Sequence, residues 1–315
     1  MHRFKSWQLF AACVLTWGTT WYAITFQLGS TPPEVGVAAR FALAGSVVIA
    51  LAAWRGDRLR FGPREHALLA LQGAFMYGVA YVCVYHAERH VVSGIVAVGY
   101  SASPLVTGFG ARVLFRTEAR PRFWAGGLLG LCGVALIFWP EFGRAAGRDG
   151  AALGALFTAG SVLLSAVGSL TASRNRVNGL PFWPALGFGM LYGAGVTLLI
   201  ALAQGASLAL PTAFSWWASL FYLALAGSVL TFACFLTLQE RIGPGPTASI
   251  GVMTPLLALL ISVAFEDFRP DLLTLAGAVI AVIGNVLMLN VGRHFALGGA
   301  ARAPARPELR VRDRR

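Results

Sequence analysis

Two rows of hydroxyl-bearing side chains run through apolar segments of this sequence at helical spacing. Tyr77, Tyr81 and Tyr85 follow one another at intervals of four residues, and so do Ser161, Ser165 and Ser169. Residues four apart share one face of an α-helix, so each row marks a stripe. A phenol surrounded by hydrocarbon needs a hydrogen-bond partner. Either neighbouring helices supply partners for these groups, or the stripes line a wet site for a ligand.

Other aromatic and polar side chains lie near the middle of further apolar segments. Aromatic faces combined with hydroxyls suit a ligand that has an apolar body and polar ends. The candidate binding residues are Trp17, Trp21, Tyr77, Tyr81, Tyr85, His86, Tyr100, Ser101, Ser161 and Ser165. The serines could instead be small residues in tight helix packing. The tryptophans at segment ends are interpreted as interfacial anchors: Trp7, Trp54, Trp139, Trp216 and Trp217.

Charged residues are scarce inside the apolar segments. Arg40 is the one clear charge there, and it could attract a substrate carboxylate or tie helices together through backbone carbonyls. The glutamates lie at segment ends or in loops: Glu34, Glu65, Glu88, Glu118, Glu141, Glu240 and Glu266. Proton relays usually need a carboxylate in mid-membrane, so the sequence predicts facilitated diffusion or exchange rather than strong proton coupling.

Several kinds of chemistry are not indicated. His86, Glu88 and His90 share a short loop without further ligands, so we expect no metal site, and we expect no cofactor. The sequence holds no phosphate-binding GxxxxGK[ST] loop and no evident nucleophile–base set, which argues against an ATPase and against an enzyme.

The composition indicates which elements must position these residues. Of 315 residues, 57% are hydrophobic and only 12% are charged, and the mean hydropathy is +0.68. A soluble domain usually carries about 25% charged residues. The surplus of apolar side chains must therefore face lipid. The net charge of +12 comes from basic residues between apolar blocks, which favours lipid headgroups over nucleic acid as the partner.

Charge-free stretches of about 20 residues predict membrane-spanning helices. Their boundaries give an all-α membrane protein with ten spans: 7–26, 34–53, 66–86, 91–111, 122–140, 151–173, 181–203, 216–238, 246–265 and 272–291. Twenty Lys and Arg residues fall on one side of this arrangement and four on the other. The positive-inside rule then places both termini in the cytoplasm.

The two halves of the chain are related. Residues 85–104 align without gaps to residues 236–255, so that Gly94 matches Gly245 and Pro104 matches Pro255. The predicted units are a first five-helix repeat (1–145), a second (146–292) and a basic disordered tail (293–315). Because five is odd, the second copy is inverted. Inverted repeats place a substrate site at their interface near the midplane, and Pro104 and Pro255 are candidate hinges or static kinks there.

These features also carry a family resemblance. Trp17-Gly18, Pro33 followed by Arg40-Phe41, Ala87 ahead of Gly94, and the Pro104 and Pro255 motifs resemble the EamA-type branch of the drug/metabolite transporter superfamily. The resemblance covers residues 7 to about 291 and implies two inverted five-helix repeats around a central cavity. It also implies export of metabolites across the bacterial inner membrane, and for Arg40 it favours a structural role.

Within that superfamily the aromatic set resembles exporters of the YddG type, which implies neutral and aromatic amino acids as substrates. The alternatives are a permease for nucleobases, drugs or other small metabolites, and a membrane-embedded enzyme or lipid flippase subunit. The expected partners are a small-molecule substrate and the lipid bilayer, and the protein is expected to act as a monomer.

Overall fold

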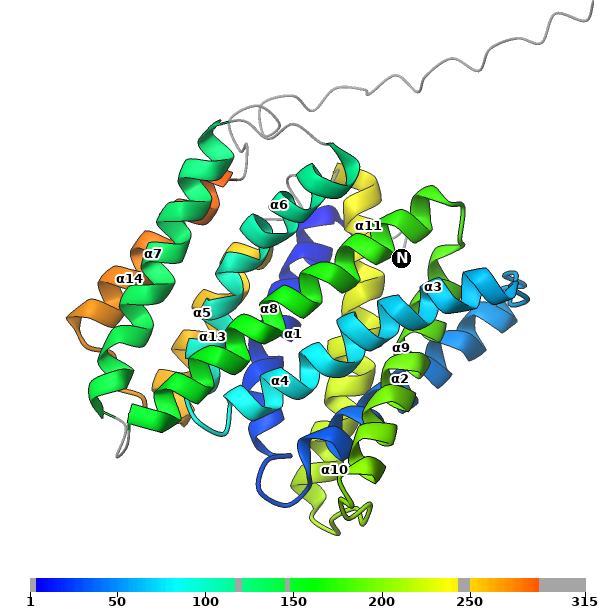
Figure 1. Cartoon of the computed structure of the whole chain (residues 1–315), viewed down its shortest axis with the longest axis horizontal. Helices are drawn as coiled ribbons and strands as arrows, with labels where there is room; N and C mark the ends of the chain where they lie inside the picture. Colours follow the sequence, from blue (N-terminus) through cyan, green and yellow to red (C-terminus); the bar gives the residue numbers. More distant parts are fainter. Residues whose placement is uncertain (1–3, 117–120, 145–147, 243–249, 289–315) are drawn as a thin grey trace, which may run out of the picture.

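The computed structural model describes residues 4–116, 121–144, 148–242 and 250–288, and within these residues the chain is helical and contains no strand. The predicted boundary at 145/146 and the predicted tail lie outside the described residues. The helices are α1 (Ser6–Thr25), α2 (Pro33–Trp54), α3 (Pro63–Gly73), α4 (Ala80–Ala87), α5 (Ser93–Gly99), α6 (Ser103–Phe115), α7 (Pro121–Arg144), α8 (Arg148–Val177), α9 (Phe182–Ala203), α10 (Phe214–Phe221), α11 (Thr231–Ile242), α13 (Ile250–Phe265) and α14 (Leu272–Met288) (Figure 1).

Three short helical segments of other geometry join some of these helices into longer rods. A π-helical segment, η1 (Ala74–Val79), lies between α3 and α4, and another, η3 (Tyr222–Leu230), lies between α10 and α11. A 3₁₀ turn, η2 (Tyr100–Ala102), lies between α5 and α6, directly ahead of Pro104. Pro104 thus follows a break in its span, whereas Pro255 lies inside the continuous helix α13.

Seven of the described helical rods are long and apolar enough to cross a membrane. They are Pro33–Trp54, Pro63–Ala87, Ser93–Leu114, Pro121–Pro140, Gly150–Val177, Phe182–Ala203 and Phe214–Phe235, and two shorter apolar helices are Met253–Phe265 and Leu272–Met288. The rod α1 is more polar because it carries Thr16, Thr19 and Thr20. Two of these hydroxyls donate to carbonyls of the same helix, Thr19 to Leu15 and Thr20 to Trp17. The membrane-protein class is confirmed, and the count of ten crossings stays a prediction.

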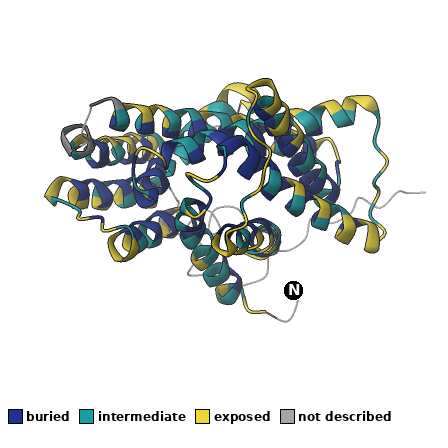
Figure 2. Ribbon diagram, turned by 90° about the horizontal axis from the view of Figure 1, so that it is seen from below, coloured by how far each residue is buried: buried dark blue, intermediate teal, exposed yellow. Residues whose placement is uncertain are grey.

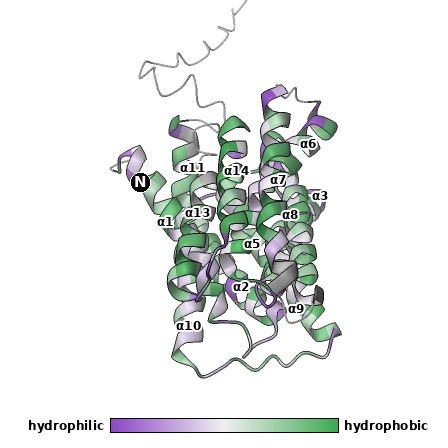
Figure 3. Ribbon diagram, turned by 90° about the vertical axis from the view of Figure 1, so that its left-hand side faces the viewer, coloured by the Kyte–Doolittle hydropathy of each residue, from purple (hydrophilic) through white to green (hydrophobic). Residues whose placement is uncertain are grey.

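Large apolar side chains cover the outside of the helices. Leu156, Leu199 and Leu260 are each 66% exposed, and buried residues gather along the inward faces (Figure 2). The hydropathy colouring shows hydrophobic outer surfaces along the rods (Figure 3). Exposed leucines on every side are the pattern expected of a surface that faces lipid.

The tryptophans that were interpreted as interfacial anchors differ in their exposure. Trp54 and Trp139 are 86% and 70% exposed, as interfacial anchors would be. Trp216 is fully buried and is the bulkiest of the fully buried side chains. Its interpretation as an anchor is therefore wrong, because the first turn of α10 packs its ring inward rather than toward headgroups.

Two helix pairs at opposite sides of the molecule are joined by very close backbone contacts. The pair α7 and α14 lies side by side along its length, and so does the pair α2 and α9 (Figure 1). A methyl group added at Gly133 would lie 2.6 Å from the carbonyl oxygen of Gly277, and one at Gly277 would lie 2.6 Å from that of Gly133. Small residues let membrane helices approach in this way. Gly133 of the first half and Gly277 of the second half therefore lie against one another.

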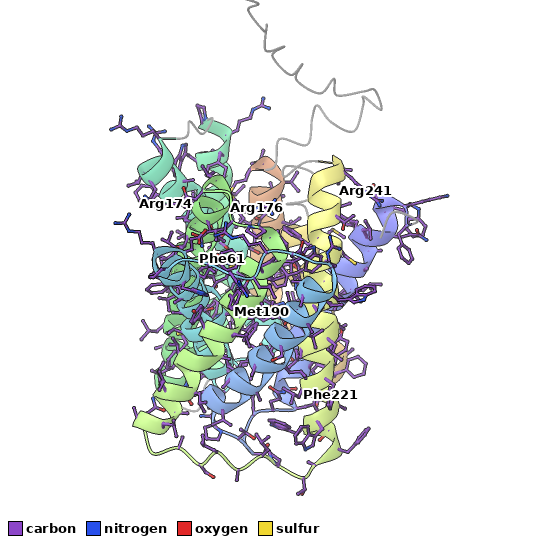
Figure 4. The ribbon with its side chains drawn as sticks, turned by 90° about the vertical axis from the view of Figure 1, so that its right-hand side faces the viewer. Phe61, Arg174, Arg176, Met190, Phe221 and Arg241 are labelled. Atoms are coloured by element: carbon purple, nitrogen blue, oxygen red, sulfur yellow. The ribbon has the colours of Figure 1, made fainter. Side chains whose placement is uncertain are left out.

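Basic side chains gather at one end of the rods. Arg174, Arg176 and Arg241 lie toward that end, and Phe221 lies toward the other (Figure 4). The positive-inside rule assigns the arginine-rich end to the cytoplasm. We refer to the two ends below as the arginine-rich end and the opposite end.

Candidate functional site

A hydroxyl cluster joins three helices near the middle of the rods. Tyr100 of η2 reaches α8, where its phenol oxygen bonds to the hydroxyls of Ser161 and Ser165, the latter at 3.2 Å. On its other side the Tyr100 ring packs edge-on against Trp21 of α1, with ring centroids 5.1 Å apart. Trp21, Tyr100 and Ser165 are only partly buried. The structure therefore brings together four of the sequence-predicted site residues. Ser101, the next residue along, is buried.

An aromatic row connects the first half of the chain to the second. Phe41 of α2 contacts Tyr77, Tyr77 contacts Phe232 of α11, and Phe232 contacts Trp17 of α1, with centroid separations of 5.4, 6.1 and 5.4 Å. The indole Nε1 of Trp17 also donates to the carbonyl oxygen of Gly227 at 3.1 Å. Trp17 is thus held by the π-helical segment η3 of the second half.

The three tyrosines of the predicted stripe have different surroundings. Tyr77 and Tyr85 are 2% and 1% exposed, and the phenol of Tyr85 donates to Oε1 of Gln27 at 2.7 Å. Tyr81 is only partly buried and packs on Phe41 at 4.7 Å. The π-helical segment η1 contains Tyr77 and has more residues per turn than an α-helix, so the spacing of four does not keep a single face. Of the stripe, Tyr81 is the one that is not buried.

Arg40 lies under the aromatic row and is almost completely buried, at 2% exposure. Its guanidinium stacks over the rings of Tyr81 and Phe41, 4.8 and 5.1 Å from their centroids. Neither Nε nor Nη1 has a hydrogen-bond partner. The cation–π contacts offset only part of the cost of removing an arginine from water. The sequence-based expectation that Arg40 bonds to carbonyls does not account for these two nitrogens.

A second polar group lies at the opposite end of the rods. His86 Nε2 is 3.0 Å from Glu34 Oε1, and the imidazole stacks on Phe157 of α8. His86, Glu34 and Arg89 line a pocket of about 450 Å³. His86 therefore joins α4 to α2 and α8 in a group apart from the Tyr100 hydroxyls. Within the described residues, no set of three or more His, Cys, Asp or Glu side chains is arranged to hold a metal ion.

Glu266, directly after α13, connects the two halves at that same end. Its carboxylate accepts from the backbone N–H of Ser93 at 3.3 Å and from the Ser93 hydroxyl at 2.6 Å, and it also accepts from Ser262. Ser93 begins α5, so the carboxylate meets the positive end of that helix. At this end α5 packs against α1 and α13, whereas α6, toward the arginine-rich end, packs against α7 and α8.

Sequence reasoning missed several residues of these groups. Phe41 and Phe232 were not distinguishable from other apolar residues, because periodicity does not say which ring faces which helix. Gln27 and Glu34 lie at segment ends, where polar residues are ordinary. One signal was present for Glu266, which recurs in both halves as Glu118 and Glu266.

The fold and these groups can be set against known proteins. The model of the EamA-like transporter family matches residues 5–139 and again residues 152–290. The chain belongs to the EamA-like transporter family. The EamA resemblance is therefore confirmed, and membership of this family indicates a transporter. The two matched segments fall one in each predicted half.

Curated proteins of this kind match most of the chain. "Uncharacterized inner membrane transporter YedA" of Escherichia coli (strain K12) is 32% identical over 257 residues, which is 80% of each chain. "Protein PagO" of Salmonella typhimurium is 24% identical and covers 82% of this chain and 83% of its own length. "Protein PecM" of Dickeya dadantii is 25% identical and covers 84% of each.

A solved structure described only as "Crystal structure of protein" has a TM-score of 0.63 to this EamA chain at 21% identity. The match covers 90% of this chain and 95% of that one. At this identity the likeness concerns the fold alone. The substrate of the EamA chain has to be argued from its own residues.

Proposed function

We propose that this EamA-family protein exports neutral and aromatic amino acids across the bacterial inner membrane by alternating access. The observations that carry the proposal are the partly buried rings of Trp21 and Tyr100 and the buried Arg40, which lies against the partly buried ring of Tyr81. Trp21 and Tyr100 form one wall, and Tyr81 covers the Arg40 guanidinium. An aromatic amino acid has a flat apolar side chain for such walls and a carboxylate for the arginine.

The hydroxyl cluster supports the same ligand class. The Tyr100 phenol, with Ser161 and Ser165, offers donors and acceptors that can rotate to suit an ammonium or a carboxylate. Ligand sites are mostly apolar, with a small number of placed polar groups. Neutral amino acids without a ring use the polar contacts and fill less of the aromatic wall, so we expect them to be weaker substrates.

The packing pattern supports the inverted-repeat arrangement on which alternating access depends. When each helix is exchanged for its counterpart in the other half, several of the main helix contacts are reproduced. The rod containing η1 packs on α8 and α9, and its counterpart, containing η3, packs on α1 and α2. In the pairs α2/α9 and α7/α14 each helix is the counterpart of the other, so the exchange leaves these two contacts unchanged. The π-helical segments η1 and η3 occupy corresponding rods.

Alternating access then requires the halves to rock about the central site. Glu266 and Ser93 hold the opposite end closed, and Pro104 and Pro255 lie in corresponding spans, Pro104 in the first turn of α6 and Pro255 inside α13. We propose these prolines as hinges. The transport cycle is facilitated diffusion or exchange, and a single chain carries it out.

The test is uptake into liposomes that contain the purified protein. Labelled phenylalanine should enter protein-containing liposomes faster than empty ones, and unlabelled tryptophan and tyrosine should compete more strongly than alanine. Strong competition by nucleobases or by aromatic cations, with none by amino acids, would favour the alternative, which is a permease or exporter for nucleobases, drugs or other small metabolites. Indifference to every aromatic amino acid would refute the substrate class and leave the transporter fold untouched.

A further inference from the structure

Arg40 has a positive charge that nothing in direct contact neutralises. An arginine does not lose its proton in a protein, so a buried guanidinium needs a counter-ion. Nε and Nη1 have no hydrogen-bond partner, and the groups against the guanidinium are neutral: the rings of Tyr81 and Phe41 and the phenol of Tyr85. On the side of the second half, a methyl group added at Gly227 would lie 3.7 Å from Nη2. Arg40 therefore lies where the two halves meet.

Glu88 is an acidic group that likewise lacks hydrogen-bond partners. It follows the last residue of α4, it is 8% exposed, and neither carboxylate oxygen has a hydrogen-bond partner. Burial, and then the negative charge of Glu266, hold the pKa of Glu88 well above its ordinary range, while the charge of Arg40 acts in the opposite direction. A buried carboxyl without partners is far less costly when it is protonated.

Two of the other titratable groups near Glu88 already have partners, and Arg89 and His90, which follow it, are exposed to solvent. Glu266 is bonded to Ser93 and Ser262, and His86, on the preceding turn, is paired with Glu34 of α2. Tyr85, from α4 itself, donates to Gln27. Arg40 and Glu88 are thus two buried ionisable groups, each without hydrogen bonds at two polar atoms, that interact electrostatically without touching.

We propose that Arg40 and Glu88 form a proton-linked receptor for the carboxylate of the substrate. When Glu88 is ionised, it serves as the counter-ion of Arg40. When a substrate carboxylate takes that place, Glu88 binds one proton from solution and stays neutral. The partly buried ring of Tyr81 covers the guanidinium, so the ring has to move for the carboxylate to enter.

The direction of the pH dependence follows from linkage. In the ligand-free protein the charge of Arg40 lowers the pKa of Glu88. A bound carboxylate neutralises that charge, so the pKa of Glu88 is higher in the complex. Between these two pKa values binding takes up a proton, so the affinity is highest at low pH and falls about tenfold for each unit of rising pH.

This inference rests on the proposed function for the identity of the ligand. It revises the expectation that transport is not strongly coupled to protons. The sequence predicted weak proton coupling because its glutamates lie at span ends. Glu88 does lie at a span end, but it is buried there, at 8% exposure.

The first experiment needs no substrate. Infrared spectra of the protein in lipid, recorded from pH 5 to pH 9, should contain a protonated carboxyl band that is absent in Glu88→Gln. The titration midpoint of that band should rise by about one pH unit or more in Arg40→Met and stay near the wild-type value in Arg40→Lys. Absence of such a band at every pH, or a midpoint that Arg40→Met leaves unchanged, overturns the inference.

The second experiment measures ligand binding by calorimetry in buffers of different ionisation enthalpy. Phenylalanine should bind to the wild type with uptake of about one proton, and to Glu88→Gln with none. Glu65→Gln, which removes a carboxylate at the other end, should behave as the wild type. Phenethylamine, which lacks the carboxylate, should bind without proton uptake.

The two experiments separate the possible failures. The wild type and Glu88→Gln differ in this one carboxyl group, so the difference between them isolates Glu88. Equal proton uptake by Glu88→Gln and the wild type refutes the inference, even if phenylalanine is transported. If phenylalanine does not bind at any pH while the infrared midpoint shifts as expected, the proposed substrate is wrong and the link between Arg40 and Glu88 stands.

Discussion

Replacing Trp21 by alanine is expected to lower the initial rate of phenylalanine uptake into liposomes about 10- to 100-fold at low substrate concentration. The indole is partly buried and packs edge-on against Tyr100, whose phenol holds Ser161 and Ser165. Removing it deletes one aromatic wall, which costs about 1.4–2.8 kcal/mol of apolar and ring contact with the substrate. Each 1.4 kcal/mol corresponds to about a tenfold change.

The matched control is Trp139→Ala. Trp139 is 70% exposed on α7, where it faces lipid, so its loss should leave the uptake rate within about twofold. Trp216 is unsuitable as a control because it is fully buried. Equal losses in the Trp21 and Trp139 variants, at equal amounts of folded protein, would contradict the placement of the substrate against Trp21.

Replacing Glu266 by alanine is expected to open the end of the molecule at which α5 meets α13. The carboxylate accepts hydrogen bonds from the Ser93 backbone, the Ser93 hydroxyl and Ser262. Hydrogen bonds to a charged group contribute about 1.5–3 kcal/mol each. Losing about 3 kcal/mol from the closed state alone would shift its population relative to the open state more than 100-fold.

Labelling of a cysteine can measure this opening. Leu259 is 7% exposed and lies against Gly94, where an added methyl group would be 2.8 Å from its Cα. In a chain whose native cysteines are replaced, Leu259→Cys should react slowly with a membrane-impermeant maleimide applied outside the cell. Adding Glu266→Ala should make the reaction at least tenfold faster, whereas adding Glu65→Ala should not. Unchanged labelling would mean that Glu266 does not hold this end closed.

The long helical rods were predictable from the sequence, because the membrane fixes the length of a spanning helix and excludes charged residues from it. Every predicted span within the described residues corresponds to a helix, with ends that differ by a few residues. The interruptions were harder to predict. Pro104 indicated the break at Tyr100–Ala102, but the π-helical segments η1 and η3 left no signal in hydropathy.

The candidate site was predictable in part. The serine row does meet Tyr100, because a regular α-helix, α8, presents Ser161 and Ser165 on one face. The tyrosine row does not form one surface, because its helix contains a π-helical segment. The sequence predicts a loop carboxylate at Glu88, whereas the structure buries it, because burial depends on segments that are distant in the chain. Contacts between distant segments of this kind are not encoded in local spacing.

Exchange across a liposome membrane tests the central claim most directly. Liposomes containing the protein are loaded with unlabelled phenylalanine and diluted into a trace of labelled phenylalanine. Alternating access at a site for aromatic amino acids predicts a transient accumulation of label inside, well above equilibrium, which Trp21→Ala abolishes and Trp139→Ala preserves. Accumulation no greater than in empty liposomes would contradict the account.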